Sequence, residues 1–251
     1  MMASASGAGT VNVFGFNVFN QDLSAIPLDG PGCRTLNTIG PDTYGIAVND
    51  PLAKAALMDS DYLVLDGVYF ALASILTRGE KIKPNQGPDV FDHFMARLEA
   101  MGGRAFFLGA SPSTIEKIKA ETARRYPNIK CDGLSPPFKP TFTDEDNEAM
   151  IAAVNAFKPD VLFLGMSAPK QEKWAYLHHD RLDAKLTVAI GAVFDWYSGT
   201  VPPLAPWWFK YRLAWLGRIV QRPANIVRMK LKAIFLWHLL QAVLRLRPSQ
   251  V

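Results

Sequence analysis

Polar residues that could do chemistry follow the ends of several apolar runs in this sequence. One run ends at Asp66-Gly67, and three others end at Gly109, Gly165 and Gly191. The carboxyl ends of parallel strands lie at one edge of an α/β sheet, where ligands bind, so these four turns predict one shared cleft. Asp66 is the leading catalytic candidate, because a carboxylate at this edge could accept a proton from a substrate hydroxyl. An aspartate that only caps the next helix fits the same spacing.

Residues 161–174, VLFLGMSAPKQEKW, predict a strand, a tight turn and the start of a helix. The free N–H groups of a helix's first turn attract phosphate, so the polar residues there could hold a diphosphate or a sugar. A solvated helix start is the alternative interpretation. The substrate-binding residues that we expect here are Gly165, Lys170, Gln171 and Glu172.

Two further turns offer similar chemistry. Gly109 and Ser111 could bind phosphate in the same way, although Ser-Pro is also a common opening of a helix. Gly191 ends the last apolar run, and Asp195 follows it. Asp195 either binds substrate or caps a helix.

Several familiar site types are missing from the sequence, which has no GxGxxG after a strand and no GxxxxGK[ST]. Residues 59–61, DSD, match the DxD pattern of metal-dependent sugar transferases. They precede an apolar run, however, which places them at the opposite edge of the sheet. The four histidines lack metal-ligand spacing, so we expect no metal and no other cofactor.

The composition is that of a globular protein: 251 residues, 49% hydrophobic and 20% charged. Cys33 and Cys131 are far apart and form no CxxC, which favours a reducing, cytosolic setting over a disulfide framework. The first ten residues, MMASASGAGT, have neither the basic nor the apolar region of a secretory signal.

The C-terminal segment differs in charge from the rest of the chain. Residues 206–251 contain nine Lys or Arg, no Asp or Glu, and four of the six Trp. Basic residues interleaved with Trp, Phe and Leu are typical of a helix that lies on an anionic membrane surface. Nucleic acid would normally come with a recognisable binding fold, and none is evident. Residues 226–246 predict a helix that charges interrupt, so we expect it to lie on a membrane or on the protein and not to cross.

Apolar runs alternate with helical patterns along the rest of the chain, which indicates right-handed βαβ units and a mainly parallel sheet. We predict a Rossmann-like α/β core with flanking helices over residues 1–199, and a basic, aromatic helical appendage that docks on membranes over residues 200–251. The predicted strands cover residues 34–39, 62–65, 104–108, 129–131, 161–164 and 186–190, with a strand pair in 11–19. The predicted helices cover residues 51–58, 68–77, 88–101, 112–126, 144–157, 169–178 and 226–246.

Six short motifs, in this order and at this spacing, resemble the WecG/TagA/CpsF glycosyltransferases, also called glycosyltransferase family 26. They are TLN at 35–37, LDG at 65–67, GPD at 87–89, FLG at 107–109, GMSAPKQEKW and AIGAVFDWYSG. The resemblance covers nearly the whole chain, and G-x-x-x-P-K-Q-E is the specific motif among them.

The resemblance implies an inverting, metal-independent transfer of a sugar from a UDP-sugar to a polyprenyl-diphosphate-linked sugar at the cytoplasmic face of the membrane. It makes Asp66 the catalytic base and Thr35, Asn37 and Gln171 substrate-binding residues. It also implies an appendage that binds membrane and supplies arginines to the site. The candidates are Arg212, Arg218 and Arg222.

The sequence departs from the family pattern at three places. The arginine that often precedes G-x-D is absent, and Lys83 is its candidate replacement. The E-W-x-x-R of the tail has Ala214 in place of glutamate, and the usual R-A-P reads LAP at 204–206. These changes suggest a different sugar pair from that of the N-acetylmannosamine transferases, for example that of a glucosyltransferase of exopolysaccharide assembly.

The donor is therefore expected to be UDP-N-acetylmannosamine, UDP-glucose or a related UDP-sugar. A nucleotide-binding oxidoreductase and a non-catalytic membrane adaptor are the alternatives. Exposed apolar surface near the tail would also be consistent with a homo-oligomer in the absence of membrane.

Overall fold

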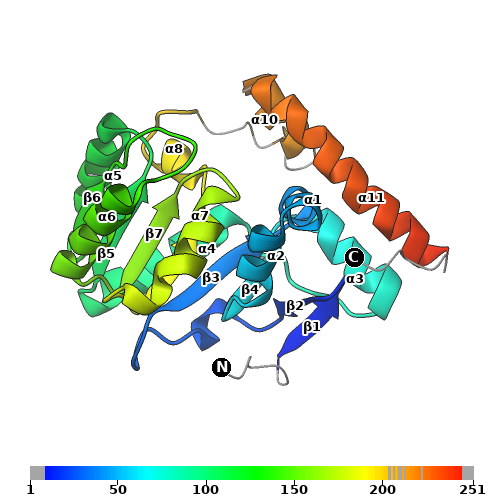
Figure 1. The fold of residues 1–251 in the computed structure, drawn as a ribbon, viewed down its shortest axis with the longest axis horizontal. Helices are drawn as coiled ribbons and strands as arrows, with labels where there is room; N and C mark the ends of the chain where they lie inside the picture. The colour runs from blue at the N-terminus through cyan, green and yellow to red at the C-terminus, as the bar shows by residue number, and fades with distance from the viewer. Residues whose placement is uncertain are drawn as a thin grey trace.

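The computed structural model describes residues 9–202, 205, 207, 208, 211, 213–221 and 223–244, which form an α/β fold around a six-stranded sheet. All neighbouring strands in this sheet are parallel, in the order β4-β3-β8-β7-β5-β6 (Figure 1). The predicted mainly parallel sheet is confirmed. The strands are β3 (Arg34–Ile39), β4 (Tyr62–Leu65), β5 (Arg104–Gly109), β6 (Lys130–Leu134), β7 (Val161–Gly165) and β8 (Leu186–Ala189).

Alternate side chains of the central strands serve two different cores, as the two-residue period of a strand requires. Phe107 and Phe163 stack at 5.6 Å on one face, which α4 (Gly87–Met101), α5 (Pro112–Arg125) and α8 (Val193–Tyr197) cover. Phe106 and Leu162 point to the other face. The helices on that face are α6 (Asp144–Phe157) and α7 (Lys170–His178), which the short η2 (His179–Arg181) follows.

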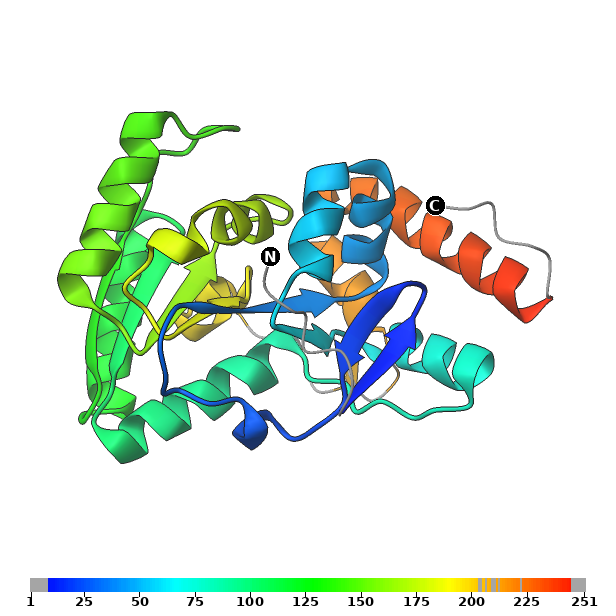
Figure 2. The same cartoon turned by 60° about the horizontal axis from the view of Figure 1, so that its bottom comes forward.

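A third core lies at the β4 edge of the sheet, under the antiparallel hairpin of β1 (Thr10–Val13) and β2 (Phe16–Phe19). A short helix, η1 (Leu23–Ala25), follows the hairpin. Figure 2 shows this hairpin at the same end of the molecule as α3 and α11. The helices that contribute to this core are α1 (Pro41–Asn49), α2 (Pro51–Met58), α3 (Val68–Arg78) and α11 (Met229–Val243).

The C-terminal helices pack on the rest of the protein. Helices α10 (Ala214–Gln221) and η3 (Pro223–Arg228) lead into α11, which lies along α1 (Figure 1). Phe235 is fully buried and stacks on Phe70 at 5.2 Å. Within the part of the chain that the structure describes, no helix is long and apolar enough to span a bilayer.

Two predicted helix starts are confirmed by their caps. Asp50 accepts the N–H of Ala53 at 3.1 Å, and Thr143 and Asp146 cap each other reciprocally. Helix α1 was not predicted, because its sequence PDTYGIAVN contains a glycine and has no clear apolar stripe. The predicted helix over 226–246 is split, since residues 223–228 form a 3-10 helix before α11 begins.

Candidate active site

The carboxyl ends of all six strands lie at one edge of the sheet. Register pairs Ile39 with Leu65, and Leu164 with Ala189, so the turns that follow these residues are neighbours. Gly109 also pairs with Gly165. The helices that leave β5 and β7 cover opposite faces of the sheet, which makes the gap between these two strands the usual place for a ligand.

Asp66 lies at this edge, directly after β4. Its backbone N–H donates to the carbonyl of Ile39 at 2.8 Å, and its side chain is half-buried. The N-cap position of α3 is Gly67, which has a φ of 85°, so the residue after Asp66 occupies the capping position. Gly40 packs against the same turn, since a Cβ there would lie 2.7 Å from the carbonyl oxygen of Asp66. The backbone therefore fixes Asp66 at the end of β4.

Gln171 and Glu172 lie in the first turn of α7, and both are buried, with exposed fractions of 4% and 2%. The Gln171 side-chain oxygen accepts the N–H of Gly191 at 3.1 Å. Its amide nitrogen donates to Glu172 Oε1 at 3.0 Å. Glu172 Oε2 is buried and has no hydrogen-bond partner among the described residues. The interpretation of this turn as a solvated helix start is therefore wrong for these two side chains.

Burial raises the pKa of Glu172 above its ordinary value. The hydrogen bond from Gln171 and the positive charge of Arg228 act in the opposite direction. Arg228 is the last residue of η3, so a cation of the C-terminal segment is close enough to Glu172 to affect its ionisation. Arg228 is not among the site residues predicted from the sequence. Its place in residues 206–251, which contain no Asp or Glu, is the feature that could have indicated it.

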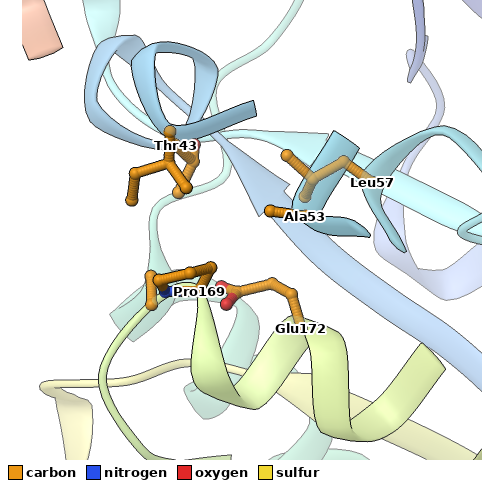
Figure 3. Close-up of a pocket in the computed structure, with 7 residues that line it drawn as sticks. Thr43, Ala53, Leu57, Pro169 and Glu172 are labelled. Carbon is orange, nitrogen blue, oxygen red and sulfur yellow. The ribbon is translucent and has the colours of Figure 1, made fainter. Parts of the chain in front are cut away.

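A small cavity of about 10 Å³ separates α7 from α1 and α2. Figure 3 shows Glu172 reaching toward Pro169, with Thr43, Ala53 and Leu57 across the cavity. The Thr43 hydroxyl accepts the N–H of Gly40 at 2.8 Å. The cavity wall is thus mainly apolar apart from the Glu172 carboxyl group and Thr43.

Lys170 begins α7 but points toward the loop that precedes α6. Its ammonium group lies 4.1 Å from the centre of the Phe142 ring and hydrogen bonds to the carbonyl of Lys139. Burial, and to a smaller extent the charge of Lys139, lower the pKa of Lys170. A substrate contact by Lys170 stays a prediction.

Protein atoms fill the space beside the two glycines of β5 and β7. A Cβ on Gly165 would lie 2.0 Å from the Phe194 ring, and one on Gly109 would lie 2.7 Å from the Gly165 carbonyl. Both glycines are therefore required for packing, whether or not they also bind substrate. Ser111 caps α5 by accepting the Thr114 N–H at 3.2 Å, and its hydroxyl also contacts that of Ser113 at 3.0 Å.

Thr35 and Asn37 are the second and fourth of the six residues of β3, so both come before its carboxyl end. Thr35 donates through its N–H and hydroxyl to Asp61 Oδ2 at 2.8 and 3.2 Å. Asn37 donates to the Ser60 hydroxyl at 2.8 Å and to the Ala56 carbonyl at 3.3 Å. These bonds tie β3 to α2 and to residues 60 and 61, which precede β4. A substrate contact by Thr35 or Asn37 stays a prediction. The structure does confirm that the DSD segment lies at the amino edge.

The remaining predicted residues lie on other parts of the chain. Asp195 lies in α8, half-buried, and its carbonyl accepts the Val201 N–H at 3.0 Å. Lys83 is exposed, and its charge acts on Asp22 and His93. Of the appendage arginines, Arg218 belongs to α10, whereas Arg212 and Arg222 lie outside the described residues.

Over the described parts of the chain, no group of three or more His, Cys, Asp or Glu side chains could hold a metal ion. Metal independence of the reaction nevertheless stays a prediction. Helix α5, of 14 residues, begins at this edge, and binding of a diphosphate by its first N–H groups stays a prediction.

Comparison with known proteins agrees with the motifs. A model of the glycosyl transferase WecG/TagA/CpsF family matches residues 12–249. A similar protein of Bacillus subtilis (strain 168) is 25% identical over 194 residues, which cover 77% of this chain and 74% of that protein. A second, of Staphylococcus aureus (strain MW2), is 24% identical over 214 residues, which cover 85% and 82%. Both relatives are named N-acetylglucosaminyldiphosphoundecaprenol N-acetyl-beta-D-mannosaminyltransferase.

Proposed function

The chain belongs to the WecG/TagA/CpsF family of glycosyl transferases, and from this premise we propose that it transfers a sugar from a UDP-sugar to a sugar carried on a polyprenyl diphosphate. The observation that carries the proposal is the family match over residues 12–249, together with the position of Asp66 at the ligand-binding edge. The names of the two relatives support a lipid-linked acceptor. The oxidoreductase and adaptor alternatives find no support in these comparisons.

In the proposed reaction, Asp66 accepts the proton of an acceptor hydroxyl while that oxygen attacks the anomeric carbon of the donor. The new glycosidic bond forms as the bond from the anomeric carbon to the UDP oxygen breaks, and UDP leaves with the bonding electrons. Attack opposite the leaving group inverts the configuration. The α5 N-terminus and cations of the C-terminal segment would stabilise the charge that develops on UDP without a metal.

We propose that the protein meets its lipid-linked acceptor through a surface on α3 and α11, which we call the apolar face. Leu236, Trp237 and Leu240 of α11 are about half exposed, as are Leu72 and Leu76 of α3. The stacking of Phe70 on Phe235 holds the two helices together. The described residues of α3, α10, η3 and α11 include no Asp or Glu, so the apolar face is complementary to an anionic bilayer.

The position of α3 explains why this surface would matter for catalysis. Helix α3, which carries part of the apolar face, begins two residues after Asp66, the proposed base. A protein seated on this face would bring Asp66 near the headgroup level, where the acceptor sugar of a lipid diphosphate resides. Association with a second copy of the chain through the same face is the competing outcome.

The test is UDP release by the purified full chain with a panel of UDP-sugars and a short polyprenyl-diphosphate N-acetylglucosamine acceptor, with and without EDTA. The proposal expects release from one donor, only when acceptor is present, and unchanged by EDTA. Loss of release in EDTA would contradict metal independence alone. Absence of UDP binding and of release with every donor would contradict the transferase proposal itself.

A further inference from the structure

The amide of Gln171 is held at both ends. Its oxygen accepts the Gly191 N–H at 3.1 Å, and its nitrogen donates to Glu172 Oε1 at 3.0 Å. Gly191 follows β8 and Gln171 follows β7, so this chain of hydrogen bonds joins two neighbouring turns of the carboxyl edge. It fixes which way the amide points.

The direction of the amide matters because its two ends have opposite hydrogen-bonding roles. A backbone N–H on one side requires the amide oxygen there, and the Glu172 oxygen on the other side requires the amide nitrogen. An amide nitrogen has two hydrogens, and Glu172 Oε1 uses one of them. Glu172 therefore selects the orientation in which Gln171 keeps a second N–H for another acceptor.

The other oxygen of Glu172 makes this carboxyl group unfavourable for stability. Oε2 is buried and has no hydrogen-bond partner among the described residues, in a side chain that is 2% exposed. A buried polar atom without a partner is unfavourable, and a well-packed apolar side chain would avoid the penalty. Such atoms in native proteins call for an explanation beyond packing.

The size of the adjoining cavity decides how Glu172 can act. The space beside the carboxyl group, about 10 Å³, is close to the minimum that one water molecule needs. A space of this size admits neither a sugar nor a phosphate, and Thr43, Ala168 and Pro169 are among the residues that line it. Glu172 thus has no room for direct contact with a substrate, in contrast to its predicted role as a binding residue.

We propose that Glu172 is a positioning residue, which orients the Gln171 amide so that its free N–H can bind an oxygen of the sugar or diphosphate in the cleft. The inference rests on the proposed function of this edge as the substrate site. It assigns the direct contact to Gln171 and an indirect role to Glu172. Gly191 completes the arrangement by holding the amide oxygen.

A double-mutant cycle tests this directly, with the wild type, Gln171→Ala, Glu172→Ala and the double variant compared by kcat/KM for UDP release. We expect each single variant to lose roughly tenfold, and the double variant to lose no more than Gln171→Ala. Glu172→Gln should restore most of the loss, because its side-chain oxygen can still accept from Gln171. Glu148→Gln is the matched control, since Glu148 is an exposed carboxylate paired with Arg181 at 2.7 Å.

Two kinetic results would overturn the proposal. Losses that multiply in the double variant would show that Glu172 acts on the substrate independently of Gln171. A Glu172→Ala variant that melts at a lower temperature but keeps the wild-type kcat/KM would show a structural role only.

Hydrogen exchange at the Gly191 amide separates this inference from the proposed function, because it needs no turnover. Gly191 N–H has two acceptors, Gln171 Oε1 at 3.1 Å and the Leu164 carbonyl at 3.2 Å. Exchange should be about three- to tenfold faster in Glu172→Ala and close to wild type in Glu172→Gln. Unchanged exchange in Glu172→Ala would overturn the positioning role, even if the wild type transfers sugar. Suppose instead that exchange is faster in Glu172→Ala but the wild type neither binds UDP nor transfers sugar. Glu172 would then still orient Gln171, and only the proposed substrate would be wrong.

Discussion

Tyr44 Oη lies 2.7 Å from His238 Nδ1, a hydrogen bond between residues 194 positions apart that joins α1 to α11. The two helices also approach closely nearby, since a Cβ on Gly45 would lie 2.5 Å from the Leu231 carbonyl. Phe235 inserts between Phe14, Tyr44 and Phe70 in the same region. Helix α11 is therefore part of the core at the β4 edge, beside the helices that flank Asp66.

The packing of α11 predicts that Phe235→Ala lowers the free energy of unfolding by about 3–5 kcal/mol, because the ring is fully buried and leaves a cavity. Trp237→Ala, two residues later, removes a side chain that is 57% exposed and should change the free energy of unfolding by about 0.5 kcal/mol or less. Urea unfolding of the full chain measures both. Equal, small effects would mean that α11 does not dock on α1 in solution.

The charge of the apolar face predicts that Lys230→Gln weakens binding to vesicles rich in anionic lipid. Lys230 is exposed on α11, and one basic residue near such a surface contributes about 1 kcal/mol, which is roughly fivefold in affinity. Lys117→Gln, a change of the same charge on the exposed side of α5, is the control. Vesicle flotation measures the binding. The membrane proposal fails if the two variants bind equally, or if the wild type binds no vesicle and sediments as a dimer.

The close packing of β7 predicts that Gly165→Ala destabilises the protein by about 1–3 kcal/mol, since the added methyl overlaps the Phe194 ring. In a Phe194→Ala background the same substitution should be nearly neutral, because the ring is gone. Thermal unfolding of the four proteins gives the coupling between the two sites. An additive result would mean that Gly165 is needed for a reason other than room for Phe194.

The raised pKa of Glu172 predicts a pH dependence of stability with a definite sign. The unfolded chain titrates near the ordinary value of 4.5, and the folded protein holds the proton to higher pH. The stabilising contribution is complete below pH 4.5 and declines as the pH rises through the folded-state pKa. Glutamine at position 172 cannot titrate. As the pH rises above 4.5, the free energy of unfolding of the wild type should therefore fall relative to that of Glu172→Gln. A difference that is constant with pH would show that the folded-state pKa of Glu172 is not raised.

The features that could be predicted from the sequence are those that neighbouring residues determine. The caps at Asp50 and Thr143 depend on the next three residues, and the turns at Asp66 and Gly191 follow directly from apolar runs. A parallel sheet then brings these turns to one edge, because its strands share a direction.

The features that could not be predicted depend on distant partners. The polar residues KQE at 170–172 suggest side chains that are exposed to solvent. Gln171 is nevertheless buried, and its hydrogen-bond partner Gly191 lies 20 residues later in the chain. The predicted strand over 34–39 already places Thr35 near its amino end, but the sequence does not reveal that Thr35 bonds to Asp61, 26 residues later. Helix α1 gains its packing surface from α11, which lies nearly 200 residues further along the chain. The division at residue 199 into core and appendage stays a prediction.

The most direct test of the central claim compares Asp66→Asn with the wild type in the UDP-release assay with lipid-linked acceptor. Asparagine keeps the size of the side chain but cannot accept the proton, so kcat should fall by roughly 10²- to 10⁴-fold while UDP still binds. Asp59→Asn, at the end of α2 on the opposite edge of the sheet, should transfer sugar at the wild-type rate. An Asp66→Asn protein that is folded, binds UDP and turns over as fast as the wild type would contradict the assignment of Asp66 as the base.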